Sequence, residues 1–362
     1  MTATLTAAPA VDDLDHARHR GRALLLGAGL GVALVATLLV AAGLGPVAVP
    51  PGTVARIIGH HTIGYPVTAD WTAAQDSIVW LVRVPRVLLG ALVGAALAIT
   101  GAVLQTVVRN VLADPHILGV TSGASTGAAV YLLFGITAAT TATALAASAF
   151  AGALAATALL FLLARINGQL TSLRLLLGGV TIGYIFSAAT SFLIFASDRP
   201  EGARTVLFWL LGSLAPAAWS SVATTVAVVA AATVAVLLLA PRLDALAAGD
   251  DTARTLGVAP NRIRLSALLI VALAVGAVVA VAGAIGFVGL IVPHVARLCA
   301  GAAHRQLLVV SGLLGALFLV VADVAARTVF APRELPIGIV TAAVGAPLLL
   351  VLIRRLQAPS AS

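Results

Sequence analysis

The sequence contains no lysine, and all 21 of its basic residues are arginine. A P-loop ATPase needs a lysine at the nucleotide phosphates and a Schiff-base enzyme needs a lysine amine, so both kinds of site are excluded. Charged residues are also scarce, at 9% of the chain, whereas a soluble domain carries about 25%. Because 61% of the residues are hydrophobic, the composition indicates a polytopic membrane protein rather than a soluble one.

Other scarce residues narrow the function further. The single cysteine, Cys299, lies in an apolar run and excludes an internal disulfide. The net charge is +8, but the arginines are scattered among apolar runs, which argues against a nucleic-acid partner. No general acid, base and nucleophile are gathered in one stretch, and His294 after Pro293 fits a capping or packing role. We therefore predict no catalytic residue, no resident metal and no cofactor.

Apolar runs of about 17–25 residues predict an all-α fold with about ten membrane-spanning helices. The expected spans are 23–44, 84–107, 117–134, 138–164, 174–196, 217–240, 263–284, 286–302, 306–326 and 336–356. Segment 206–213 is too short to span and fits a re-entrant or interfacial half-helix. Pro293 and Pro347 should kink or break their helices. Three Gly-x-x-x-Gly pairs predict close helix packing: Gly27/Gly31, Gly90/Gly94 and Gly179/Gly183.

The distribution of arginine predicts the orientation. An even number of spans places both termini on one side of the membrane. Fourteen arginines then fall on the side of the termini and seven on the other side, so the positive-inside rule places both termini in the cytoplasm. The expected organisation is a cytoplasmic tail over 1–22, a membrane domain over 23–356 and a C-terminal tail over 357–362. We interpret 23–44 as a retained helix rather than a cleaved signal peptide.

Two polar stretches interrupt the apolar runs. The island 241–264 reads as two short helices, Leu243–Ala248 ended by Gly249 and Asp250–Leu256 ended by Gly257. It is either an ordinary solvated loop or a docking element for a soluble partner. On the opposite side, the longest external segment, 45–82, contains a short surface helix and the adjacent pair His60 and His61. Neighbouring side chains point apart, so a metal site at this pair is disfavoured.

Several stretches resemble one family. RVPRVLLGALVGAALAITGAVLQ (83–105) and RNVLADPHILGV (109–120) are similar to the permease subunits of type II ABC importers, the iron–siderophore and cobalamin permeases. Four later stretches resemble the same family in the same order: 247–258, 282–301, 322–327 and 334–347. Val111 departs from the pattern, because the family commonly has proline there. The resemblance covers roughly residues 20–356.

This resemblance implies a multi-pass permease of the cell membrane that pairs with a second permease, two cytosolic ATP-binding subunits and an extracytoplasmic binding protein. It also implies three sets of site residues. The ATPase-coupling residues are Gly249, Asp250, Asp251, Arg254, Leu256 and Gly257. The cytoplasmic gate residues are Asn110, Leu112, Ser172 and Leu173. The binding-protein docking residues are Arg83, Arg86 and Arg327.

The expected cargo is a ferric siderophore or a similar metal chelate, and the permease itself changes no bond. A cobalamin or haem importer of the same family is the alternative. An ion-coupled secondary transporter is an alternative of a different class, and it requires a buried carboxylate facing a pathway. Asp323, near the outer end of an expected span, is the nearest residue of that kind. For the three docking arginines, the competing interpretation is arginines anchored at the membrane interface, and for Asn110 it is a helix cap.

Overall fold

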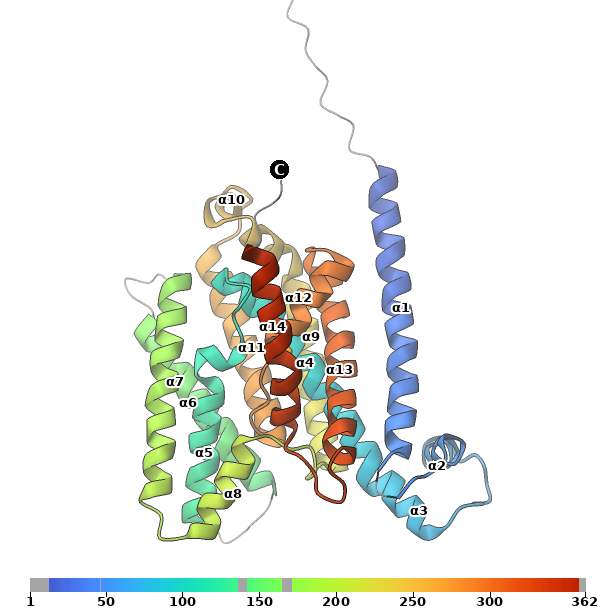
Figure 1. Ribbon diagram of the computed structural model, residues 1–362. Coiled ribbons are helices and arrows are strands. Elements are labelled where there is room, and N and C mark those ends of the chain that lie inside the picture. Colours follow the sequence, from blue (N-terminus) through green and yellow to red (C-terminus); the bar gives the residue numbers. More distant parts are fainter. Residues whose placement is uncertain (1–12, 46, 136–141, 165–170, 358–362) are drawn as a thin grey trace, which may run out of the picture.

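The computed structural model describes residues 13–45, 47–135, 142–164 and 171–357, and all regular structure in these ranges is helical (Figure 1). The helices are α1 Asp13–Gly43, α2 Pro51–Ile63, α3 Ala73–Ser77, the π-helix Ile78–Arg83, α4 Val84–Val108, the 3-10 helix Pro115–Leu118, α5 Val120–Phe134, α6 Ala142–Ala164, α7 Ser172–Phe195, α8 Pro200–Leu210, α9 Trp219–Ala247, α10 Asp250–Thr255, α11 Pro260–Ala282, α12 Val288–Ala300, α13 His304–Thr328 and α14 Ile337–Gln357. The all-α prediction is confirmed.

The expected spans correspond closely to these helices. Within the described ranges, seven helices are long and apolar enough to cross a membrane, and Val120–Phe134, Val288–Ala300 and Ile337–Val351 are shorter apolar helices. Segment 206–213 falls largely in α8, which has only 11 residues. The first helix begins at Asp13, so the helical part of the chain extends into the predicted tail 1–22. Residues 1–12 of that tail and 358–362 of the C-terminal tail lie outside the described residues.

Helix α4 is the centre of the bundle. It is buried along nearly its whole length and packs against α9, α11, α12 and α13. Its neighbours come close because glycine faces glycine. A Cβ on Gly94 would collide with the carbonyl oxygen of Gly315 in α13, and a Cβ on Gly101 would collide with that of Gly289 in α12. Helices α5 and α6 meet in the same way at Gly123 and Gly152.

The three predicted Gly-x-x-x-Gly pairs differ in whether they bring helices of this chain into close contact. Gly94 lies at a helix crossing, and Gly119 packs against the backbone of Gly179 and Gly183. A Cβ on Gly27 or Gly31, by contrast, would meet no atom within 4 Å. The Gly-x-x-x-Gly spacing in α1 is thus not used for packing within this chain.

The structure departs from two expectations about helix ends. Pro293 and Pro347 lie inside α12 and α14, which continue on both sides of each proline, so neither proline breaks its helix, and a kink at either one stays a prediction. The predicted short helix Leu243–Ala248 is the last part of α9, which also runs through Pro241. Leu243 and Leu246 are fully buried, and this packing holds the helix together although a proline removes one backbone hydrogen bond.

The bundle has two ends, which we name by the helices that they carry (Figure 1). The α10 end contains α10, the start of α7 and the end of α14, whereas the α2 end contains α2, α3 and α8. At the α2 end, the expected surface helix is α2. His60 and His61 have separate partners there: His60 Nδ1 contacts the Pro66 carbonyl at 2.7 Å, and His61 Nε2 lies 3.1 Å from Asp76.

The glycine crossings predict opposite effects for one substitution in two helices. Gly94→Ala forces α4 away from α13, and overpacking of this kind costs about 1–3 kcal/mol. Gly27→Ala meets no neighbour within the chain and also gains helix propensity, so it should leave stability unchanged or slightly higher. Thermal unfolding in detergent micelles, followed by circular dichroism, measures both. An equal Tm for the two variants would contradict the packing described here.

Candidate functional site

At the α2 end, three predicted docking arginines converge on one acidic residue and on the end of α1. Arg86 Nη2 lies 2.9 Å from Asp323 Oδ1, and Arg327 Nε lies 3.3 Å from Asp323 Oδ2. Arg86 also pairs with Glu334 at 2.9 Å. Arg86, Arg327 and Asp323 are nearly fully buried, and Glu334 is the partly exposed member of the cluster, with 41% of its side chain accessible.

Arg83 and Arg327 also satisfy the last carbonyl groups of α1. The final four carbonyls of any helix have no partner inside the helix. Arg83 donates to the carbonyl of Gly43 at 2.9 Å, and Arg327 donates to that of Ala41 at 2.7 Å and to that of Leu44, the residue after α1, at 2.9 Å. The two guanidinium groups therefore cap a helix C-terminus, where positive charge is favoured. They are structural groups of this chain, and their docking role stays a prediction.

At the α10 end, the predicted coupling segment forms a small projecting helix. Gly249, with φ of 124°, separates α9 from α10, and Gly257, with φ of 75°, follows it. Both conformations favour glycine. Asp251, Arg254 and Leu256 point outward, with exposed side chains. The projecting surface of α10 thus presents an acidic side chain, a basic side chain and a leucine within one short segment.

Asp250 points inward and is clamped by two arginines. Arg264 of α11 donates to both of its carboxylate oxygens, at 2.9 and 2.7 Å, and Arg109 reaches Oδ1 at 2.5 Å. Arg264 is only 3% exposed. The hydrogen bonds from Arg264, together with the charges of both arginines, lower the pKa of Asp250. Because the folded-state pKa is depressed, this clamp contributes stability above the unfolded value of about 3.9 and loses it as the pH falls below that value.

Arg109 connects this clamp to the predicted gate. It ends α4 in a left-handed conformation, with φ of 53°, and its guanidinium also donates to the carbonyl of Leu246 in α9 at 3.2 Å. Asn110 follows directly in the chain. Through its guanidinium group, Arg109 therefore links the turn after α4 to the end of α9, at the Leu246 carbonyl, and to the start of α10, at the Asp250 carboxylate.

The gate residues lie on two neighbouring segments. Asn110 accepts the backbone N–H of Leu112 at 2.9 Å, so its side chain shapes the turn after α4. The Ser172 hydroxyl donates to the carbonyl of Val107 at 3.3 Å, which joins the start of α7 to the end of α4. Leu173 is 66% exposed and Leu112 is 36% exposed. The structure thus brings the predicted gate residues together and leaves their leucines open to a partner.

Sequence reasoning missed the residues that connect these sites. Asp323, Glu334, Arg109 and Arg264 were not among the predicted site residues, although each pairs with one of them. A second inner link was also missed: His304 Nδ1 lies 2.6 Å from Asp244, and its Nε2 lies 2.8 Å from the Thr106 hydroxyl. The sequence did carry one signal for these pairs, because an arginine within an apolar run needs an acidic or carbonyl partner. A single sequence does not show which acid is that partner.

Comparisons with known proteins give a consistent result. Residues 33–355 match the model of the FecCD transport family. The chain is 39% identical to the cobalamin import system permease protein BtuC of Halobacterium salinarum, over 92% of this chain and 96% of that protein. It is 40% identical to the Fe(3+) dicitrate transport system permease protein FecD of Escherichia coli, over 80% of this chain and 89% of that protein. A solved structure, described as an inward-facing conformation of a metal-chelate type ABC transporter, superposes with a TM-score of 0.79 at 33% identity and covers 91% of this chain and 98% of its own.

The cluster at the α2 end predicts a large effect for one isosteric change. Asp323→Asn removes the carboxylate shared by two buried arginines, and breaking a buried ion pair in this way costs about 3–5 kcal/mol. The matched control is Asp70→Asn, because Asp70 pairs with Arg56 at 2.6 Å with half of both side chains exposed. That change should cost less than about 1 kcal/mol. A Tm for Asp323→Asn equal to that of the control would show that the cluster does not hold the α2 end together.

Proposed function

The chain belongs to the FecCD transport family and is a permease subunit of an ABC importer, and we propose that it carries a ferric siderophore or a similar metal chelate into the cytoplasm. The relatives named for cobalamin and ferric dicitrate both handle a metal held in an organic ligand, which supports a chelate as cargo. Cobalamin or haem is the alternative cargo within the same family.

The proposed topology has ten spans and two cytoplasmic termini. It is supported by the seven long apolar helices together with the three shorter ones. Arginines 109, 242, 254, 262 and 264 all lie at or beside the α10 end, which is the arrangement that the positive-inside rule expects of a cytoplasmic surface. In this orientation the α2 end faces outward.

We propose that α10 is the contact for the ATP-binding subunits. The chain has no lysine for a nucleotide site of its own, and α10 projects from the proposed cytoplasmic end with Asp251, Arg254 and Leu256 accessible. A complex of two permeases and two ATP-binding subunits would present two such helices. ATP binding then biases the permeases between outward-open and inward-open states through these contacts.

The movement of α10 reaches the gate through Asp250 and Arg109. Asp250 is the first residue of α10, and Arg109 precedes the gate residue Asn110. A displacement of α10 therefore pulls on the turn after α4. Because Ser172 holds the start of α7 to Val107, Leu112 and Leu173 move with the same unit. In a pair of permeases, these leucines from both subunits would close the inner end of the pathway.

A second permease fits the exposed apolar side of α7. Leu173, Leu177, Val180 and Tyr184 recur at helical spacing, and all four side chains are exposed in the isolated chain. We propose that either a second copy or a related permease packs in the region of this helix, so that the two gates meet.

An ion-coupled secondary transporter is less well supported. Its best candidate residue, Asp323, is 1% exposed and is neutralised by Arg86 and Arg327. A coupling carboxylate must face a pathway, whereas Asp323 is enclosed by the guanidinium groups of Arg86 and Arg327.

If ATP hydrolysis drives import, vanadate should stop uptake in reconstituted vesicles, whereas a protonophore should leave uptake unchanged. Uptake that stops with the protonophore and survives vanadate would favour the secondary transporter.

An external binding protein is proposed to dock over the arginine cluster at the α2 end. Arg83 and Arg327 are committed to α1, so Arg86 is the arginine that an incoming acid can share. Glu334 pairs with Arg86 and is itself partly exposed, and we propose that it holds the position that a carboxylate of the binding protein takes on docking.

Two glycines test the contact at α10. Gly257 and Gly301 both adopt left-handed φ values, 75° and 80°, and a Cβ added to either would meet no atom within 4 Å. Valine in a left-handed conformation costs about 1–2 kcal/mol, and Gly301, with ψ of −169°, lies in a region that is essentially restricted to glycine, so the control adds at least as much strain. Only Gly257→Val distorts the end of α10, so it should lower transport-coupled ATP hydrolysis about tenfold, while Gly301→Val should stay near wild type. Equal rates in the two variants, with equal amounts inserted, would exclude α10 as the ATPase contact.

Glu334 tests the docking proposal. Glu334→Gln removes the resident charge from Arg86, so an acidic binding protein should associate faster and with a lower Kd, most strongly at low salt. Glu201→Gln is the control, because Glu201 is an exposed acid in the first turn of α8 at the same end. Surface plasmon resonance with immobilised permease measures both. Weaker binding of Glu334→Gln than of the control would show that Glu334 itself contacts the partner.

A further inference from the structure

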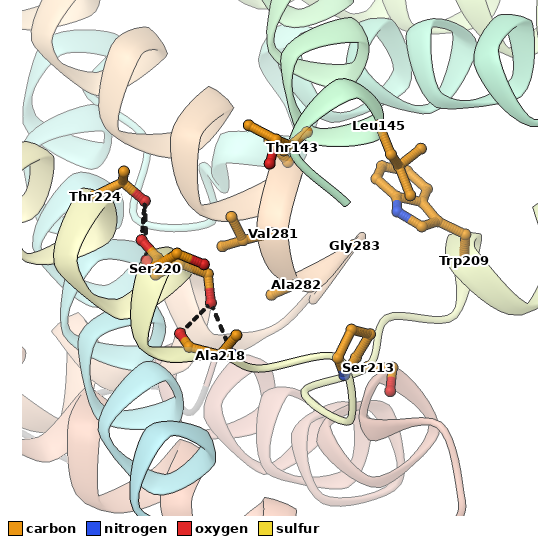
Figure 2. Close-up of a pocket in the computed structure, with 14 residues that line it drawn as sticks. Thr143, Leu145, Trp209, Ser213, Ala218, Ser220, Thr224, Val281, Ala282 and Gly283 are labelled. Atoms are coloured by element: carbon orange, nitrogen blue, oxygen red, sulfur yellow. Dashed lines mark hydrogen bonds between the residues drawn. The ribbon is translucent and has the colours of Figure 1, made fainter. Parts of the chain in front are cut away.

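A cavity of about 210 Å³ opens at the α2 end between the start of α6, the linker from α8 to α9, the start of α9 and the end of α11 (Figure 2). Its lining includes Trp209 and several hydroxyl side chains, which we call the rim, together with Ala280, Val281 and Ala282. Nothing in the import mechanism above uses this cavity. Three of the helices that line it, α6, α9 and α11, are candidate membrane spans, and the lining residues lie at their ends near the α2 end, so we expect the mouth of the cavity to lie at the membrane surface.

Unused hydrogen-bond donors gather at this rim. The indole N–H of Trp209 and the hydroxyls of Thr143 and Ser220 have no partner among the described residues (Figure 2). In contrast, the neighbouring hydroxyls of Ser221 and Thr224 donate to backbone carbonyls at 2.7 and 3.1 Å. Within the part of the chain that the structure describes, no charged side chain lines the cavity. The rim therefore suits a ligand that presents acceptor oxygens near a membrane surface.

A second cavity, of about 480 Å³, lies deeper along the same three helices. Its described lining has no polar side chain and consists of Phe150 of α6, Ile270, Leu273 and Ala274 of α11, and Ala227, Val228, Ala231, Ala232 and Ala235 of α9. Four of the five residues from α9 are alanines, whose small side chains leave a channel on that side of the helix. An apolar chain is the ligand that such a wall accepts.

The two cavities follow one face of α9. Ser220 and Thr224 line the outer cavity, and Ala227, Ala231 and Ala235 line the inner one. These positions recur every three or four residues and therefore share one side of the helix. From residue 220 to residue 235 the helix rises about 22 Å, at about 1.5 Å per residue. Half of a bilayer with its headgroups measures about 20–22 Å, so the face spans one leaflet.

We propose that the groove between α6, α9 and α11 binds one glycerophospholipid of the leaflet at the α2 end. The acyl chain lies along the alanines of α9, and the ester or phosphate oxygens accept hydrogen bonds from Trp209, Thr143 and Ser220. Tryptophan is enriched at this depth of the membrane because its ring is apolar and its N–H needs an acceptor. This proposal depends only on the chain lying in a bilayer, not on the cargo or the ATPase.

The size and chemistry of the groove favour a lipid over other occupants. One turn of a partner helix, about 10 Å wide and about 5.4 Å long, occupies about 400 Å³, which exceeds the volume of the outer cavity, about 210 Å³. An anionic chelate would be expected to require a cationic side chain, and none of the described residues lining either cavity is cationic. A chain that is oxygenated at one end and apolar along the rest matches both cavities at once.

Native mass spectrometry of the detergent-purified protein tests the site with two neighbouring alanines. Ala231 lines the inner cavity, whereas Ala230 is exposed on another side of α9 at the same depth and lines neither cavity. The wild type and Ala230→Phe should each retain one added phosphatidylglycerol or phosphatidylethanolamine per permease at activation energies that strip detergent. Ala231→Phe should lose this retained lipid. Equal retention by the two variants would overturn the proposal.

The polar end is tested separately. Trp209→Phe combined with Ser220→Ala removes two donors and leaves the alanine channel intact, so the retained lipid should dissociate at lower activation energy than from the wild type. Circular dichroism should show unchanged helix content in all variants. Retention of detergent alone by the wild type, with no phospholipid adduct after lipid is added, would also overturn the proposal. Failure of the ATPase experiment at Gly257 would leave this result unaffected.

Discussion

The close approach of α4 to its neighbours is the constraint on which the rest of the structure depends. In a bilayer, helices gain little from hydrophobic burial and are held by close packing and polar contacts. Glycine at positions 94 and 101 lets α4 touch the backbones of α13 and α12 at Gly315 and Gly289. As a result α4 is buried along nearly its whole length. The side chains at its two ends are therefore held in fixed positions relative to the rest of the bundle.

Both ends of α4 carry arginines that bind other helices. At the α2 end, Arg83 and Arg86 join this helix to the end of α1 and to Asp323 of α13. At the α10 end, Arg109 joins it to Asp250 of α10. Burying an arginine is expensive unless it is paired and hydrogen-bonded, and each of these side chains has carbonyl or carboxylate partners. The bonds that stabilise the fold therefore also lie at the two surfaces for which we propose a function.

Much of the fold could be predicted from the sequence because the membrane demands long apolar helices. The limits of α4, α7 and α13 followed from hydropathy within a few residues. The partners of side chains could not be predicted. Gly27/Gly31 and Gly90/Gly94 have the same spacing, but only Gly94 faces a helix crossing within this chain. Likewise, Asp250 and Asp251 are adjacent acids, and which one turns inward depends on Arg109 and Arg264 from distant parts of the chain.

The central claim is that movement of α10 reaches the gate through the Asp250–Arg109 pair, and a double-mutant cycle tests it most directly. Arg109→Gln, Asp250→Asn and the double variant are reconstituted with the ATP-binding subunits, and transport-coupled ATP hydrolysis is measured for each. If the two side chains act through one bond, the double variant loses no more activity than Asp250→Asn alone. If the two losses multiply, Arg109 and Asp250 act independently, and the gate must receive the movement of α10 by another route.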